Sequence, residues 1–160
     1  MSKIYVFHGV NLHLLGVREP DIYGRTSLEE LDKKLTSMGE ENGAQVECRQ
    51  TNHEGEMIDW ITSLKPTDFL ILNPAAWTHS SYAIFDALKG VQIPTLEVHL
   101  SNIHARESFR SNSLITGACL GQISGLGTDS YLLAMAYAIE FQKHRQSEEV
   151  NTTETANGSI

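Results

Sequence analysis

The chain has little cysteine, little positive charge and no long apolar run. Its 160 residues include only Cys48 and Cys119, too few for a disulfide-rich secreted domain, and we expect two buried free thiols. No apolar run approaches the roughly 18 residues of a membrane-spanning helix, and no signal peptide precedes the first strand-like segment. These absences predict a cytoplasmic protein without a membrane partner.

Lysine and arginine number 12 against 20 aspartates and glutamates, which gives a net charge of −8. A broad surface for nucleic acid or for an anionic membrane needs clustered basic residues, so the composition argues against both partners. A small anionic substrate is not excluded, because a few local arginines can outweigh the overall sign.

Strand-like and helix-like segments alternate along the chain. Short β-branched and apolar runs predict strands at residues 3–8, 44–50, 68–73, 94–100 and 119–124. Ser27 and Glu30 form a capping-box pattern, and leucines at helical spacing follow them. Five strands separated by helices predict a flavodoxin-like, doubly wound parallel sheet in a three-layer α/β/α fold.

The pattern predicts one domain over residues 1–143, and the polar segment 144–160, which has no aromatic residue, predicts a disordered tail. Ligands of doubly wound sheets bind outside the carboxyl ends of the strands. We therefore expect the functional site in the segments that follow strands one, three and four, at residues 9–26, 73–80 and 99–110.

The long first loop carries a tyrosine between two arginines, Arg18 and Arg25. A guanidinium stays protonated and favours the phenolate form of a neighbouring tyrosine, so Tyr23 is a candidate base. The same residues also fit a packing tyrosine beside two solvated arginines, and the loop alone does not decide between these readings.

Two further pairs lie in the fourth strand and directly after it. Glu97 and His99 share one face of that strand, where a carboxylate can fix the imidazole tautomer and leave the other nitrogen free to act as an acid. A buried histidine–glutamate pair without catalytic function is the alternative. Arg106 and Arg110 are spaced to share a helical face and suit a carboxylate or polyol ligand, or are simply exposed charges.

Cofactor and metal motifs are missing from the sequence. The seven histidines include no pair at helical spacing with a third ligand in view, so we predict no metal. The segment from Gly125 to Gly127 lacks the third glycine of a dinucleotide fingerprint and follows the last strand, so it predicts a helix entry. No phosphate-binding loop occurs.

Five stretches, in order, resemble the type II 3-dehydroquinate dehydratases over roughly residues 3–143. They are Gly9–Gly16, Arg18–Gly24, Gln50–Gly55, Leu72–Ser80 and Glu97–Arg106. The resemblance implies a flavodoxin-like fold and the reversible dehydration of 3-dehydroquinate to 3-dehydroshikimate, without metal, Schiff base or other cofactor. It also implies a homododecamer built from trimers. The step serves either the shikimate pathway to aromatic amino acids or quinate breakdown, and the sequence does not distinguish them.

The same resemblance implies a role for each candidate residue. Tyr23 accepts the proton from C2, and His99 protonates the leaving C1 hydroxyl. Arg18 lies beside the tyrosine, Asn11 positions a water near the enolate, and Glu97 is the partner of the acid histidine. The residues expected to contact substrate are Asn73, His79, Leu100 through its backbone, Ser101, Arg110 and, from a neighbouring subunit, Asp86.

The chain departs from the family pattern Asn-Gly-Pro-Asn-Leu-Asn at His8, Val10 and His13. Val10 restores a backbone N–H and loosens φ relative to proline. These departures keep one alternative open, a catalytically impaired homologue retained for assembly. A flavodoxin-like binding module for a flavin or nucleotide is the second alternative.

Overall fold

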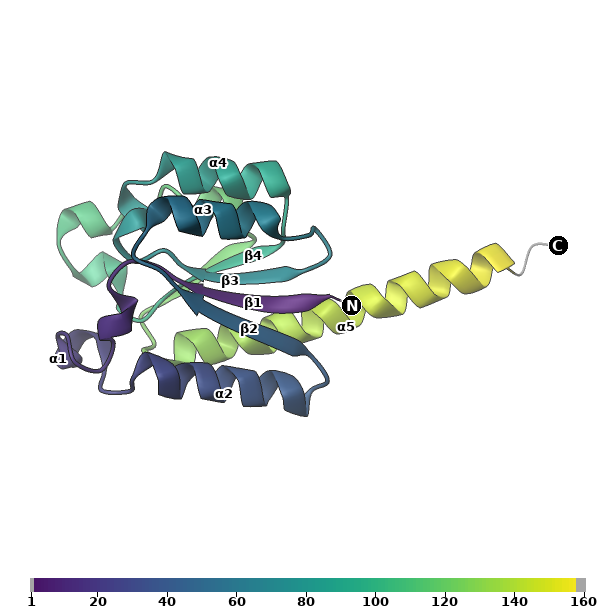
Figure 1. Cartoon of the computed structure of the whole chain (residues 1–160), viewed down its shortest axis with the longest axis horizontal. Coiled ribbons are helices and arrows are strands. Elements are labelled where there is room, and N and C mark those ends of the chain that lie inside the picture. The colour runs from purple at the N-terminus through teal and green to yellow at the C-terminus, as the bar shows by residue number, and fades with distance from the viewer. Residues whose placement is uncertain (1, 158–160) are drawn as a thin grey trace.

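A five-stranded parallel sheet lies between two pairs of helices in the computed structural model, which describes residues 2–157 (Figure 1). The spatial order of the strands is β2-β1-β3-β4-β5, which confirms the predicted flavodoxin-like topology. The strands are β1 (Lys3–His8), β2 (Gln45–Gln50), β3 (Phe69–Asn73), β4 (Thr95–His99) and β5 (Gly121–Ser124).

Helices α2 and α5 cover one face of the sheet, and α3 and α4 cover the other (Figure 1). The helices are α1 (Pro20–Tyr23), α2 (Leu28–Glu41), α3 (Glu54–Ser63), α4 (Tyr82–Val91) and α5 (Asp129–Asn157). The loops predicted without regular structure contain short 3-10 helices, at η1 (Leu12–Leu14), η2 (Ala75–His79), η3 (Ile103–Ala105), η4 (Ser108–Arg110) and η5 (Thr116–Ala118).

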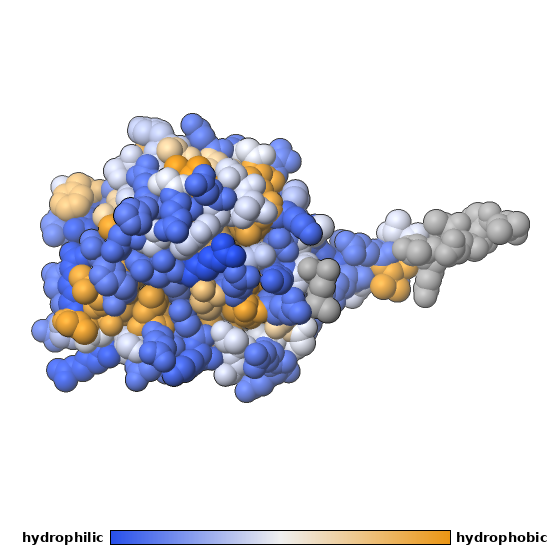
Figure 2. All heavy atoms as spheres, in the orientation of Figure 1, coloured by the Kyte–Doolittle hydropathy of each residue, from blue (hydrophilic) through white to orange (hydrophobic). Residues whose placement is uncertain are grey.

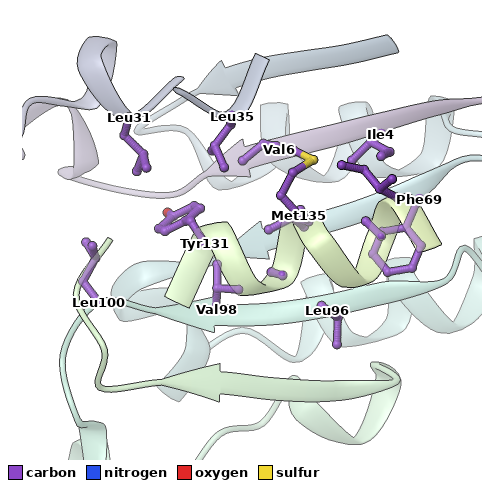
Figure 3. Close-up of a cluster of buried hydrophobic side chains, with 14 of the residues drawn as sticks. Ile4, Val6, Leu31, Leu35, Phe69, Leu96, Val98, Leu100, Tyr131 and Met135 are labelled. Carbon is purple, nitrogen blue, oxygen red and sulfur yellow. The ribbon is translucent and has the colours of Figure 1, made fainter. Parts of the chain in front are cut away.

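The central strands send alternate side chains into two cores, because successive residues of a strand point to opposite faces. On the α2/α5 face, Ile4 and Val6 of β1 pack in one buried cluster with Leu31, Leu35 and Met135 (Figure 3). On the other face, Phe7, Leu70 and Leu72 pack against side chains of α3 and α4. Strands β3 and β4 are buried along their whole length, as a parallel sheet covered on both faces requires.

The end of β1 lies unusually close to the end of β3. The Gly9 amide donates a hydrogen bond of 2.7 Å to the carbonyl of Asn73. A Cβ atom at Gly9 would lie 2.5 Å from the Pro74 carbonyl oxygen, so only glycine allows this approach. The contact brings the two strand ends together where the site was expected.

The chain end differs from the predicted disordered tail. Helix α5 continues to Asn157, and residues 158–160 lie outside the described part of the chain. Arg145 still donates to the Pro66 carbonyl at 3.0 Å, and beyond it the helix projects from the domain (Figure 1). The coloured surface of the projecting segment is mainly hydrophilic (Figure 2). No glycine or proline occurs between Asp129 and Asn157, so no residue in this stretch breaks the helix once it has been nucleated in its packed part.

Both cysteines are free, as expected, although each is half-buried rather than fully buried. Within residues 2–157, no helix combines the length and the apolar character needed to cross a membrane.

The predicted capping box at the start of α2 is present. The Ser27 hydroxyl accepts a hydrogen bond from the Glu30 amide at 3.2 Å, and the Glu30 carboxylate accepts one from the Ser27 amide at 2.9 Å. We expect Ser27→Ala to lower the free energy of unfolding by about 1 kcal/mol and the midpoint of thermal unfolding by about 2–4 °C. Ser37→Ala, at an exposed position within α2, is the matched control and should cause no loss. Equal midpoints of thermal unfolding for the two variants would show that the Ser27–Glu30 capping box does not stabilise the protein.

Candidate active site

One pocket opens at the carboxyl ends of the strands, where the parallel sheet brings three loops together. It is lined by parts of the segments that follow β1, β3 and β4, as the topology predicts. Nine of the predicted site residues line it, namely Asn11, Arg18, Tyr23, Asn73, His79, His99, Leu100, Ser101 and Arg110. Glu97 lies behind His99, and Asp86 is exposed on α4 outside this pocket.

Glu97 and His99 form a buried pair on the side of the sheet that faces α3 and α4. The distance from His99 Nε2 to Glu97 Oε1 is 2.6 Å, and the two side chains are 6% and 0% exposed. Since Glu97 occupies Nε2, the remaining ring nitrogen, Nδ1, is the one available to a ligand. The predicted pairing along one strand face is therefore present, with the carboxylate fixing the imidazole.

The Glu97 carboxylate has several donors besides His99. Ser113 Oγ donates to both carboxylate oxygens, at 2.9 and 3.0 Å, and Thr116 Oγ1 donates to Oε2. Burial raises the pKa of Glu97, but the hydrogen bonds from His99, Thr116 and Ser113 outweigh it and hold the pKa below its usual value. The residue is therefore a carboxylate at neutral pH.

Tyr23 lies against an arginine that the sequence did not single out for it. The guanidinium carbon of Arg106 is 5.1 Å from the centroid of the Tyr23 ring, within the range of a cation–π interaction. Arg106 also donates to Ser101 Oγ at 3.4 Å. Arg18, the predicted neighbour of Tyr23, lines the same pocket and pairs with Glu19 at 3.4 Å. No sequence spacing links residues 23 and 106, so only the fold reveals this contact.

Two pocket residues have a left-handed backbone although neither is glycine. Asn11 has φ 67° and Ala75 has φ 53°. The Asn11 amide donates to Asn52 Oδ1 at 2.8 Å, and the Ala75 amide donates to Asn73 Oδ1 at 3.0 Å. A left-handed non-glycine residue costs about 1–2 kcal/mol, and such strain gathers at functional sites. These side-chain acceptors hold both turns in place.

His79 and Arg110, which line the pocket, are each held by a contact with a nearby loop residue. His79 Nδ1 donates to the Asn112 carbonyl at 2.8 Å, which leaves Nε2 as the ring nitrogen available to a ligand. Arg110 Nε pairs with Glu107 at 3.0 Å, and only 20% of its side chain is exposed. The pocket can therefore offer hydrogen-bond donors and acceptors to a polar, anionic molecule.

His8, Asp32 and Cys48 bring three potential metal ligands within 4.8 Å of one another. Both ring nitrogens of His8 are already hydrogen-bonded, to Tyr131 and to Asp32. Burial raises the pKa of the Cys48 thiol far above its usual value, so the thiol stays protonated. The donor set fits a hydrogen-bond network better than a metal site.

Comparison with known proteins finds a matching family model and similar proteins that all carry the name of the same enzyme. The family model described as Dehydroquinase class II matches residues 2–139. The chain is 58% identical to the 3-dehydroquinate dehydratase of Desulfitobacterium hafniense strain Y51 over 140 residues, 88% of this chain and 97% of that protein. It is 50% identical to the 3-dehydroquinate dehydratase of Halalkalibacterium halodurans over 144 residues, 89% and 99% of the two chains.

Solved structures agree with the sequence matches. The crystal structure of type II dehydroquinase from Propionibacterium acnes has a TM-score of 0.84 and 42% sequence identity, and the match covers 88% of this chain and 97% of that one. The fold, with a pocket lined by tyrosine, histidine and arginine side chains at the carboxyl edge of the sheet, and the matches to known proteins together define an α/β enzyme. The chain belongs to the class II dehydroquinase family and is a hydro-lyase.

The ionised state of Glu97 makes a prediction about stability. A lowered pKa in the folded state stabilises the protein above the unfolded pKa of about 4.3, and this contribution is lost as pH falls through the folded value. We expect Glu97→Gln to lower the free energy of unfolding by about 2–4 kcal/mol at pH 7. The gap from wild type should shrink below about pH 4.3 in denaturant titrations.

Glu41→Gln is the control, because Glu41 is an exposed carboxylate at the end of α2. Its unfolding curve should follow that of wild type across the pH range. A constant gap between Glu97→Gln and wild type from pH 7 to pH 3 would show that Glu97 is not held as a carboxylate.

Proposed function

We propose that Tyr23 and His99 act as the base and the acid in the reversible dehydration of 3-dehydroquinate to 3-dehydroshikimate. The observation that carries the proposal is the convergence of both side chains on one pocket that also holds Arg18, Arg106 and Arg110. The chemistry needs a proton acceptor, a proton donor and cationic groups for an anionic substrate, and it needs no metal or cofactor.

In the first step, Tyr23 as phenolate removes a proton from C2, next to the C3 ketone. The C2–H bond breaks, and its electron pair moves toward the ketone oxygen to form an enolate. Arg106 lies over the Tyr23 ring, within the range of a cation–π interaction, and Arg18 lines the same pocket. A water held by Asn11 stabilises the enolate oxygen, where charge develops in the transition state.

In the second step, the enolate collapses and the C1 hydroxyl leaves. The C1–O bond breaks, the C1=C2 double bond forms, and His99 gives its proton to the departing oxygen, which leaves as water. Glu97, with its donors Ser113 and Thr116, holds the His99 ring in place. A general acid and a general base each contribute typically about 10²–10⁴-fold to rate.

The remaining predicted residues are proposed to bind substrate. Their donors and acceptors face the ring hydroxyls and the carboxylate of the substrate, and arginine suits that carboxylate because it can bind it through two parallel hydrogen bonds. These residues are Asn73, His79, Ser101, Arg110 and the backbone of Leu100.

We expect Tyr23→Phe and His99→Ala each to lower kcat by about 10²–10⁴-fold, because each variant removes one proton-transfer group. The measurement is the ultraviolet absorbance of the conjugated enone product. Tyr82→Phe removes a phenol hydroxyl from an exposed tyrosine on α4 and should keep full activity.

A fully active Tyr23→Phe enzyme would remove the base assignment. An inactive wild-type protein with normal folding would instead support the impaired-homologue alternative that His8, Val10 and His13 raise. A yellow, flavin-bearing protein without dehydratase activity would support the binding module.

The proposal includes assembly, because Asp86 is exposed on α4 and does not line the pocket of its own chain. A neighbouring copy in a trimer, four of which would form a dodecamer, supplies Asp86 to the site. Homo-oligomers with closed symmetry allow every site to be completed in the same way.

Subunit mixing tests this contribution. We expect Asp86→Ala and Tyr23→Phe to be nearly inactive alone, whereas hybrids reassembled from both should recover activity, in about a quarter of sites if subunits mix at random. The recovered sites pair an intact Tyr23 with a neighbour's intact Asp86. A fully active Asp86→Ala enzyme, or a monomeric active species in sedimentation, would contradict the proposal.

A further inference from the structure

The chain makes a type II β-turn from Gly9 to Leu12, directly after β1. The Leu12 amide donates to the Gly9 carbonyl at 3.3 Å, which closes the turn. Asn11, the third residue, has φ 67° and ψ 0°, close to the roughly +80° and 0° of that position in a type II turn. Because Asn11 also lines the pocket, the type of this turn decides how Asn11 is presented to a ligand.

A type I turn of the same four residues is the competing conformation. The two types differ in the peptide between the second and third residues, which is turned over, so that φ of the third residue is about −90° in type I. Asparagine tolerates positive φ better than most residues, but it also fits a type I turn. Val10, the second residue, lacks the ring with which proline would fix φ. The residues of the turn therefore leave its type open.

The peptide that distinguishes the two types is the one that Asn52 holds. Its N–H belongs to Asn11 and donates to Asn52 Oδ1 at 2.8 Å. In a type I turn the same N–H points to the opposite side, so this hydrogen bond cannot form. Asn52 therefore stabilises the type II form and not the type I form.

The Asn52 acceptor is itself held by a neighbour on β2. Gln50 Nε2 donates to Asn52 Oδ1 at 3.0 Å and to the Gly9 carbonyl at 3.3 Å. The register of the sheet produces this arrangement, because His8 on β1 pairs with Gln50, and the Thr51 amide donates to the His8 carbonyl at 3.1 Å. The two loops thus leave adjacent strands at the same level (Figure 1).

Asn52 has no part in the chemistry proposed above. It lies in Gln50–Gly55, one of the five stretches that carry the family resemblance, and it is not among the residues that line the pocket. Its contact with the Asn11 amide connects it to the pocket through the backbone. Any effect of Asn52 on the reaction must therefore pass through Asn11.

We propose that Asn52 is a positioning residue that selects the type II form of the Gly9–Leu12 turn and so orients Asn11 toward the water that stabilises the enolate. This inference rests on the proposed function, in which Asn11 holds that water. The charge on the enolate oxygen develops in the transition state, so a misplaced Asn11 slows the reaction without weakening substrate binding.

The test is a set of steady-state measurements in the enone assay. We expect Asn52→Leu to lower kcat about five- to tenfold, because one hydrogen bond changes the balance between two conformations by about that factor. The value of KM should stay within about threefold of wild type, and Asn52→Ala should behave in the same way. Asn52→Asp keeps an oxygen acceptor for the Asn11 amide and should hold kcat within about threefold.

Asn42→Leu is the matched control. Asn42 is an exposed asparagine at the end of α2, and its side chain also makes one hydrogen bond to the backbone, to the Met38 carbonyl at 2.9 Å. Its loss should leave both kcat and KM unchanged.

A double-mutant cycle separates positioning from general structural damage. Asn11→Gly removes the carboxamide and leaves positive φ free of strain, and it should lower kcat at least as much as Asn52→Leu. If Asn52 acts through Asn11, Asn52→Leu lowers kcat no further in the Asn11→Gly background. A crystal structure of Asn52→Leu should show the turned-over peptide, with φ of Asn11 at about −90°.

An unchanged kcat in Asn52→Leu, an equal loss in Asn52→Asp, an additive cycle, or an Asn52→Leu structure in which φ of Asn11 stays positive would overturn the positioning role. An unchanged kcat in Asn11→Gly would overturn it as well, while the roles of Tyr23 and His99 stand. Absence of dehydratase activity in the folded wild-type protein would overturn the proposed function itself, so the two failures have different results.

Discussion

The parallel alignment of five strands is the constraint on which the site depends. Because all five carboxyl ends meet at one edge, loops that are distant in sequence lie side by side there. The register pairs His8 with Asn73, and Leu72 with Glu97, so these polar residues lie within one position of one another at the end of the sheet. A slip of one residue would turn each of them to the opposite face.

The two faces of the sheet then serve the pocket differently. On the α3/α4 side, Glu97 is an ionised carboxylate held by several donors, and it fixes the imidazole proposed as the acid. On the α2/α5 side, the buried ring of His8 is hydrogen-bonded to Tyr131 and to Asp32. Both are buried polar groups inside apolar cores, where an unpaired donor or acceptor costs about 1–3 kcal/mol. Because of this cost, each buried side chain is held in the one orientation in which its hydrogen bonds are made.

Much of the fold was accessible from pattern alone, because its signals are local. The Ser27–Glu30 box marked the start of α2 correctly, and the alternation of strands and helices predicted the topology. The C-terminal segment was different. Its polar composition predicted disorder, but the structure extends α5 through it. Polar composition indicates that a segment cannot pack into a core. It does not show whether the segment can extend a helix that is already nucleated, where each added residue also adds one backbone hydrogen bond.

The sequence by itself determined the family resemblance, the sheet topology, the three loops that form the site and the pairing of Glu97 with His99, since each follows from residue type and short spacing. Only the tertiary structure placed Arg106 over Tyr23 and joined Asp32 to Tyr131 through His8. These contacts link residues 24 to 123 positions apart, on elements whose approach depends on packing. No periodic pattern along the sequence predicts a contact between residues so far apart.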